Sequence, residues 1–191
     1  MDIICTPAIL SGKIKAISSK SDAHRILICA SLCDKTTKIN CNVMSKDIAA
    51  TIDCLKSMGT DISICGETIT VTPKQFNGKA DLDCGESGST LRFLMPLGSA
   101  LGMDATITGH GRLPQRPISP LKEEMEKKGV TFHTGSEFPL HLTGELQAGE
   151  YEIAGNISSQ FITGLIFALL YLGEDSLIEI YKKLRPGELP T

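Results

Sequence analysis

A repeat with an offset of about 70 residues constrains the fold of this 191-residue sequence more than any other feature. Two copies open with a short polar stretch rich in Ser and Gly, at residues 18–24 and 85–90, and an apolar run follows. Residues 155–160 open a third, still more apolar run in the same way. Apolar runs that follow capping residues predict helices, here over 26–32, 91–101 and 161–172.

The segments between these helices also recur in a fixed order. In the first two copies a predicted strand, a second helix ending in Gly59 or Gly129, and a predicted hairpin follow. Two short strands around a turn are expected over residues 3–17. The sequence therefore predicts an α+β fold, a pseudo-threefold domain of repeated βαβαββ units. We place the units at 13–78, 79–148 and 149–184, with the first two complete and the third ending after its second strand.

The third unit is shorter because the sequence offers no second helix or hairpin after residue 180. In repeat proteins, a missing neighbour leaves apolar faces uncovered. We therefore expect the chain to be part of a longer protein. Residues 185–191 fit neither pattern and are expected to be a tail outside the repeat, which foreign residues would explain.

The charge balance argues against nucleic acid as a partner. The formal net charge is -3 and the pI is near 5.8, whereas a general nucleic-acid binder has a basic surface and a high pI. No apolar run approaches the roughly 18 residues that span a bilayer, and the N-terminus lacks the pattern of a signal peptide. We expect a cytoplasmic protein without membrane contacts, in which local clusters of basic residues mark binding sites.

The seven cysteines predict neither disulfides nor a metal site. Their number is odd, no two have CxxC spacing, and none follows Cys84. This distribution fits neither a disulfide framework nor a zinc site. We expect reduced, mostly buried thiols.

The polar stretch before the first helix is a candidate anion site. Ser19, Ser21 and Asp22 each suit the N-cap position, and the free N–H groups of a first helical turn attract anions. Lys20 and Arg25 add two positive charges at the same place. Arg binds a phosphate or carboxylate bidentately, while Lys supplies a movable charge. A compact anionic substrate is therefore expected here.

Small polar residues recur at the start of all three helices, including Gly88 and the pair Ser158 and Ser159. For one helix, capping is a sufficient explanation, and His24 is likewise expected to serve in capping. If the units pack around a pseudo-threefold axis, however, three helix N-termini converge on one surface. The recurrence favours a shared anion site, with Gln160 as a polar contact at the mouth of the third helix.

Two arginines in the loop 109–117 form a second candidate anion site. Arg112 and Arg116 lie among glycines and prolines, which stiffen the loop and let a ligand approach closely. The sequence favours anion binding and pairing with a nearby carboxylate equally. Arg92, inside an apolar helix pattern, is expected to form an internal ion pair with Glu86.

Four separated motifs, in this order, resemble those of the 5-enolpyruvylshikimate-3-phosphate synthases, the enolpyruvyl transferases of the shikimate pathway. They are Lys20-Ser-Asp-Ala-His-Arg25, Gly85-Glu-Ser-Gly-Ser-Thr-Leu-Arg92, Arg112 to Ile118, and Ser158-Ser-Gln-Phe161. The resemblance extends to about Leu184 and covers only the first half of a family member.

The resemblance implies a two-domain fold, in which each domain holds three copies of the repeat unit and the substrates bind in the cleft between them. This chain would supply one domain, and residues 1–12 would begin in the other. The family transfers the enolpyruvyl group of phosphoenolpyruvate to the 5-hydroxyl of shikimate 3-phosphate and releases phosphate, without a metal or organic cofactor.

Site residues are implied by resemblance, position by position. Shikimate 3-phosphate would be held by Ser21, Arg25, Ser158, Ser159 and Gln160. Phosphoenolpyruvate would be held by Lys20, Gly88, Arg116 and again Gln160. The family's acid and base candidates and further phosphoenolpyruvate-binding arginines belong to the second domain. We therefore expect this chain to bind shikimate 3-phosphate weakly and to be inactive alone, with the missing C-terminal domain as its partner.

The sequence departs from the family at two loops. Ser18-Ser19 replaces the usual Pro-Gly, and residues 86–89 replace Asn-Ala-Gly-Thr. One alternative is a domain like the UDP-N-acetylglucosamine enolpyruvyl transferases, which share the repeat. Lys20-Ser21 and the absence of Cys from the Arg112 loop argue against that alternative. The other alternative is a non-catalytic module that binds a protein partner.

Overall fold

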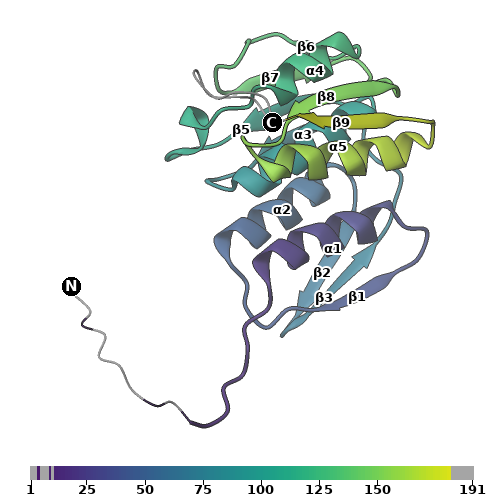
Figure 1. Ribbon diagram of the computed structural model, residues 1–191. Helices are drawn as coiled ribbons and strands as arrows, with labels where there is room; N and C mark the ends of the chain where they lie inside the picture. The colour runs from purple at the N-terminus through teal and green to yellow at the C-terminus, as the bar shows by residue number, and fades with distance from the viewer. Residues whose placement is uncertain (1–3, 5–8, 10, 182–191) are drawn as a thin grey trace.

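The second repeat unit is complete in the computed structural model, which describes residues 4, 9 and 11–181 (Figure 1). β4 and β5 run parallel, with Leu82 beside Ile107, and an antiparallel hairpin completes the sheet in the order β4-β5-β7-β6. This is the predicted order of strand, helix, strand, helix and hairpin. The elements are β4 (Lys79–Asp83), α3 (Gly88–Ala100), β5 (Asp104–Thr108), the short 3-10 turn η1 (Leu113–Gln115), α4 (Leu121–Lys127), β6 (Thr131–Phe132) and β7 (Leu140–Thr143).

The first unit has the same order but no first strand in the described residues. Its three strands form an antiparallel sheet in the order β1-β3-β2, which α1 and α2 cover (Figure 1). Alternate residues of β3 point inward, and Ile69 and Val71 are fully buried. The elements are α1 (Lys20–Leu32), β1 (Thr37–Asn40), α2 (Lys46–Ser57), β2 (Asp61–Cys65) and β3 (Thr68–Thr72).

The strand expected at the start of the first unit is wrong for residues 11–17. This segment has no strand partner among the residues that the structure describes, and Ile14 and Ile17 are 95% and 74% exposed. Its polar contacts are side-chain contacts: Asn42 accepts from the backbone N–H of Ser18 and donates to the carbonyl oxygen of Ala16, and Lys15 pairs with Glu67 at 3.3 Å. A strand requires a neighbour for its backbone groups, and alternation in the sequence does not supply one. The strand expected before residue 11 and the tail 185–191 lie outside the described residues, apart from residues 4 and 9.

The third unit contains β8 (Glu150–Ala154), α5 (Ser159–Leu172) and β9 (Leu177–Tyr181). β8 and β9 pair in parallel, as β4 and β5 do in the second unit. Apolar side chains of this unit remain exposed on both the helix and the last strand. They are Ile166, Leu170, Tyr171, Leu177, Ile180 and Tyr181.

The core is centred on α3, whose residues are nearly all buried. α5 packs against α3 at Gly164, where a Cβ would lie 2.1 Å from the carbonyl oxygen of Arg92. The absence of a side chain at Gly164 therefore sets how closely the two helices approach. The chain is an α+β domain of repeated units, as predicted. Across residues 11–181, no helix is long and apolar enough to cross a membrane.

Candidate anion-binding site

A pocket of about 420 Å³ lies where the N-terminal ends of α1, α3 and α5 meet. α1 contributes its first residue, α3 its first two and α5 its second. Because the N-terminus of a helix carries partial positive charge, three such ends at one pocket favour an anionic ligand. The described residues that line the pocket are Lys20, Asp47, Glu86, Gly88, Ser89, Arg112, Arg116 and Gln160.

Each of the three helices begins at a serine cap. The hydroxyl oxygens of Ser19, Ser87 and Ser158 each accept a hydrogen bond from a backbone N–H in the first turn, at 3.2 to 3.3 Å. A cap of this kind satisfies one free N–H group of the first turn. Of the three cap candidates for the first helix, Ser19 is the one used.

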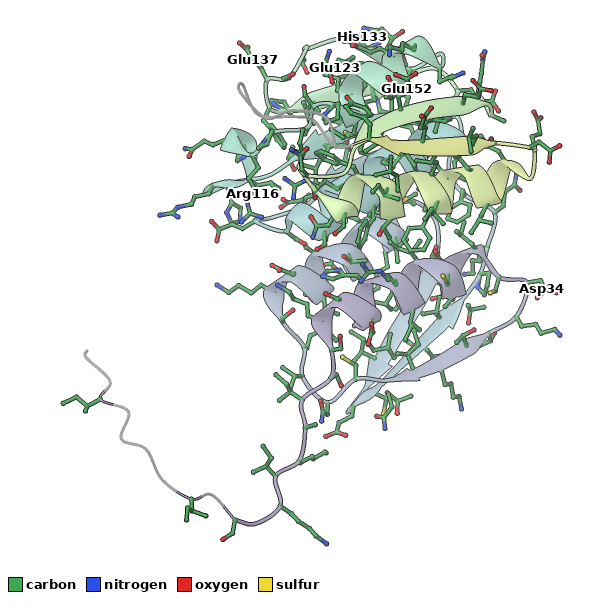
Figure 2. The ribbon with its side chains drawn as sticks, in the orientation of Figure 1. Asp34, Arg116, Glu123, His133, Glu137 and Glu152 are labelled. Atoms are coloured by element: carbon green, nitrogen blue, oxygen red, sulfur yellow. The ribbon has the colours of Figure 1, made fainter. Side chains whose placement is uncertain are left out.

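Charged side chains of both signs meet in the pocket. Lys20 Nζ donates to Asp47 Oδ2 at 2.7 Å, and both side chains are partly exposed. Arg112 and Arg116 belong to the connection between β5 and α4, and Figure 2 labels Arg116 there. With Glu86 on the lining, three cations face two carboxylates. The pocket therefore carries a net positive charge, in addition to the helix ends.

Arg92 is bound differently from what the sequence predicts. Its Nη1 donates to Gln160 Oε1 at 2.7 Å, and the expected ion pair with Glu86 is not formed. Glu86 instead packs over Gly111, where a Cβ would lie 1.6 Å from Oε1. Burial, followed by the positive charge of Arg116, lowers the pKa of the Arg92 guanidinium.

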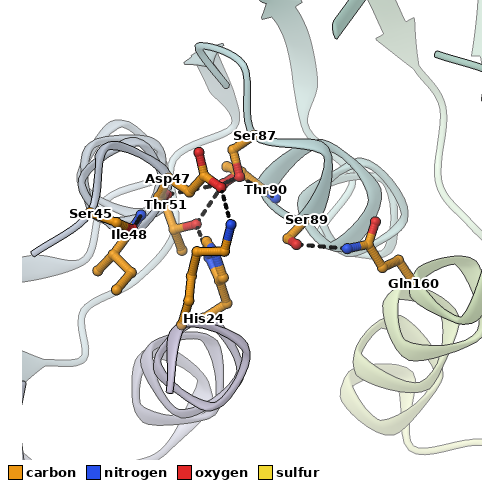
Figure 3. A network of polar contacts seen from close by, with 10 residues as sticks. His24, Ser45, Asp47, Ile48, Thr51, Ser87, Ser89, Thr90 and Gln160 are labelled. Atoms are coloured by element: carbon orange, nitrogen blue, oxygen red, sulfur yellow. Dashed lines mark hydrogen bonds and ion pairs between the residues drawn. The ribbon is translucent and has the colours of Figure 1, made fainter. Parts of the chain in front are cut away.

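Gln160 joins α5 to α3 at the pocket. Its Nε2 donates to Ser89 Oγ at 2.7 Å (Figure 3). Its Oε1 accepts from Arg92. A donor on one side and an acceptor on the other fix the orientation of the amide. Gln160 lies at the mouth of the third helix, where the sequence predicts a polar contact.

The structure brings together half of the expected site residues. Lys20, Gly88, Arg116 and Gln160 line the pocket. Ser21, Arg25, Ser158 and Ser159 lie at the same helix ends without lining it.

The four residues outside the lining have local roles or face solvent. Arg25 Nη1 donates to the carbonyl oxygen of Ser21 at 2.9 Å, and its guanidinium lies 5.5 Å from the ring centre of Phe93. Arg25 is therefore held against its own helix and α3. Ser158 acts as the cap of α5, and the next residue, Ser159, is exposed.

Sequence reasoning missed the polar side chains beneath the pocket. His24, expected in capping, is instead fully buried and bonded to Thr51, which contacts Thr90 (Figure 3). The available signal was a polar residue within an apolar stripe, since Thr51 lies between Ile48 and the apolar residues that follow on α2. Asp47 was also missed, although it lies in the first turn of a helix.

The thiols are less buried than expected. Cys41, Cys54 and Cys84 are buried, whereas Cys29, Cys33 and Cys65 are exposed, and all six are free. Within residues 11–181, no group of three or more His, Cys, Asp or Glu side chains could hold a metal ion.

Comparison with known proteins agrees with the motifs. Residues 4–186 match the family model of EPSP synthase (3-phosphoshikimate 1-carboxyvinyltransferase). The 3-phosphoshikimate 1-carboxyvinyltransferase of Clostridium kluyveri is 40% identical over 181 residues, which are 93% of this chain and 42% of that protein. The enzyme of the same name from Clostridium perfringens is 40% identical over 187 residues, 95% of this chain and 44% of that protein.

A solved structure of EPSP synthase from Acinetobacter baumannii has the same fold. It superposes with a TM-score of 0.76 at 22% sequence identity, and the match covers 91% of this chain and 41% of that one. The chain thus spans less than half the length of the relatives it matches.

Proposed function

This chain belongs to the EPSP synthase family, and from that premise we propose that it forms one half of an active site for enolpyruvyl transfer. In the complete reaction, the 5-hydroxyl of shikimate 3-phosphate adds to the enolpyruvyl carbon of phosphoenolpyruvate. Inorganic phosphate is then eliminated through a tetrahedral intermediate. No metal or organic cofactor is needed for these steps.

One observation carries the proposal: three helix N-termini and three cationic side chains meet at a single pocket. Two phosphorylated substrates repel each other, so a site that holds both must supply several positive charges at once. In our proposal Lys20, Gly88 and Arg116 bind phosphoenolpyruvate, and Gln160 lies between the two substrates.

Shikimate 3-phosphate is assigned to the residues beside the pocket. Ser21 and Arg25 at the start of α1, and Ser158 and Ser159 at the start of α5, flank the lining from two sides. For Arg25 to take part, its guanidinium must exchange the carbonyl oxygen of Ser21 for a ligand oxygen. An anionic oxygen is the stronger acceptor of the two, which favours this exchange.

We further propose that the chain alone binds shikimate 3-phosphate weakly and does not turn over. Turnover would require a second domain that carries the acid, the base and further arginines, and that the chain meets as its partner. The exposed apolar side chains of α5 and β9 support a further packing partner. In this proposal residues 1–12 begin in that domain, residues 13–184 form the repeat domain and the protein acts in the cytoplasm.

A titration of the ¹⁵N-labelled chain with shikimate 3-phosphate, followed by amide chemical shifts, tests this assignment. We expect saturable shifts at Ser21, Arg25, Ser158 and Ser159, and no phosphate release when phosphoenolpyruvate is added. Lys20→Met should weaken the binding of phosphoenolpyruvate, whereas Lys38→Met, at an exposed position of β1, should not. Absence of saturable shifts would exclude the binding site, and turnover by the chain alone would exclude the claim of inactivity.

A further inference from the structure

A chain of buried hydrogen bonds runs beneath the pocket from α1 through α2 to the cap of α3 (Figure 3). His24 Nδ1 lies 2.7 Å from Thr51 Oγ1, and Thr51 Oγ1 lies 2.7 Å from Thr90 Oγ1. The hydroxyl of Thr90 donates to Ser87 Oγ at 2.7 Å. Ser87 Oγ also accepts from the backbone N–H of Thr90, so this series of hydrogen bonds ends at the N-cap of α3.

The four side chains are almost completely shielded from water, since none is more than 1% exposed. Burial lowers the pKa of His24 to about 4, and the nearby charges of Lys20 and Arg25 act in the same direction, against Asp47. The imidazole is therefore neutral near pH 7. Its other nitrogen, Nε2, is buried and has no hydrogen-bond partner in the part of the chain that the structure describes, and the imidazole ring lies edge-on to Phe93.

The number of protons available determines which group donates in each hydrogen bond of this series. Each hydroxyl has one proton to donate, and the distance of 2.7 Å makes Ser87 Oγ a better acceptor for the proton of Thr90 than the carbonyl oxygen of Asp47 at 3.4 Å. Thr90 must then accept from Thr51, and Thr51 must accept from His24. This requires the proton on Nδ1 and leaves a lone pair on Nε2. The opposite tautomer would bury an N–H donor without an acceptor.

We propose that His24 is a positioning residue, whose Nδ1–H starts a one-way series of hydrogen bonds that holds the first turn of α3 against α1 and α2. The first turn of α3 contains Gly88 and Ser89, which line the anion pocket. Hydrogen bonds that polarise one another in a buried chain strengthen one another, so the whole series acts as one tie. The identity of the ligand rests on the proposed function, but the tautomer and the position of α3 do not.

The tautomer is tested first, on the wild-type chain. Long-range ¹H–¹⁵N correlation spectra of the imidazole at pH 7 are expected to show a protonated Nδ1 and an unprotonated Nε2 for His24. A proton on Nε2, or on both nitrogens, would overturn the proposal. This measurement needs no ligand, so it stands even if neither substrate binds to the chain.

The positioning role is tested with matched variants. Thr51→Val interrupts the series with little change of volume and is expected to raise the Kd for phosphoenolpyruvate, the ligand proposed for Gly88, roughly three- to tenfold, the effect of one lost hydrogen bond. The amide shifts of Gly88 and Ser89 should move as well. Ser31→Ala removes another buried hydroxyl, at the far end of α1, and should leave Kd and these shifts unchanged.

A conservative substitution at His24 distinguishes a role in positioning α3 from a general contribution to the stability of the fold. His24→Asn keeps an N–H donor close to the place of Nδ1 and should retain wild-type affinity to within about threefold. His24→Leu should weaken binding as Thr51→Val does. Wild-type affinity and unchanged Gly88 and Ser89 shifts in a folded Thr51→Val chain would overturn the proposal, as would equal losses in the Asn and Leu variants. If the wild-type chain does not bind its substrate, the proposed function fails. The amide shifts of Gly88 and Ser89 in the Thr51→Val chain still test the positioning role in that case.

Discussion

The guanidinium of Arg116 lies against the Cα of Gly88. A Cβ built on Gly88 would stand 2.8 Å from Nη1 of Arg116 and 3.1 Å from Nη1 of Arg92. Gly88 is the first residue of α3, where backbone N–H groups are free to bind a ligand. The missing side chain therefore allows a cationic group and a helix terminus to reach the same anion.

Gly88→Ala is predicted to weaken the binding of phosphoenolpyruvate while preserving the fold. The backbone is helical there, so Ala is tolerated, but the new methyl group must push the flexible Arg116 side chain aside. Loss of one well-placed charged hydrogen bond costs about 1.5–3 kcal/mol, which corresponds to at least a tenfold rise in Kd. Isothermal titration calorimetry with phosphoenolpyruvate measures the Kd of both chains. An unchanged Kd would show that Arg116 does not act through this contact.

Two other helical glycines should respond to alanine in opposite directions. At Gly164 a Cβ would meet the carbonyl oxygen of Arg92 at 2.1 Å and Pro96 Cγ at 3.0 Å, so α5 must move away from α3. We expect Gly164→Ala to lower the free energy of unfolding by about 2–3 kcal/mol, as overpacking does. At Gly98 a Cβ would meet, among the described residues beyond the helix's own backbone, only Met103 Sδ at 3.9 Å. Gly98→Ala should therefore raise the free energy of unfolding by about 0.5–1 kcal/mol. Urea denaturation of both variants measures the difference, and equal effects would contradict the packing of α3 on α5.

The starts of the three helices could be predicted from the sequence because their signals are local. A capping serine followed by an apolar run indicates where α1, α3 and α5 begin, whatever the rest of the chain does. The convergence of the three ends followed from the repeat, since like units place like ends together. Lys20, Gly88 and Gln160 lie at these ends and line the pocket, whereas Arg116 is predicted from the arginine loop 109–117 instead.

The errors concern contacts between residues far apart in the sequence. Arg92 has Gln160 as its partner, 68 positions away, where the sequence suggested the nearby Glu86. The alternation around Ile14 suggested a strand, but whether a strand forms depends on a neighbouring strand edge. The sequence indicates only a capping role for His24, because its partner, Thr51, comes from another helix.

The stability of the chain should depend on pH through His24. Its pKa is about 4 when folded and 6.5 when exposed, so between these values the unfolded chain binds a proton that the folded chain does not. The free energy of unfolding should therefore fall as the pH drops from 6.5 to 4, by at most roughly 3 kcal/mol. Urea denaturation across this range should show a shallower slope for His24→Asn. If the free energy of unfolding depends on pH equally in the wild-type and His24→Asn chains, burial does not hold His24 neutral.

Gln160→Glu should weaken anion binding without unfolding the chain. A carboxylate at this position can still accept from Arg92 Nη1, and the hydroxyl of Ser89 can turn to donate to it, so the contacts between α5 and α3 are preserved. The added negative charge, however, lies on the lining of a pocket whose cations must hold phosphorylated ligands. We expect the free energy of unfolding to stay within about 0.5 kcal/mol of wild type and the Kd of both substrates to rise at least tenfold. The rise should shrink at high salt, because screening weakens repulsion between partly exposed charges, whereas an effect independent of salt would point to lost hydrogen bonds instead.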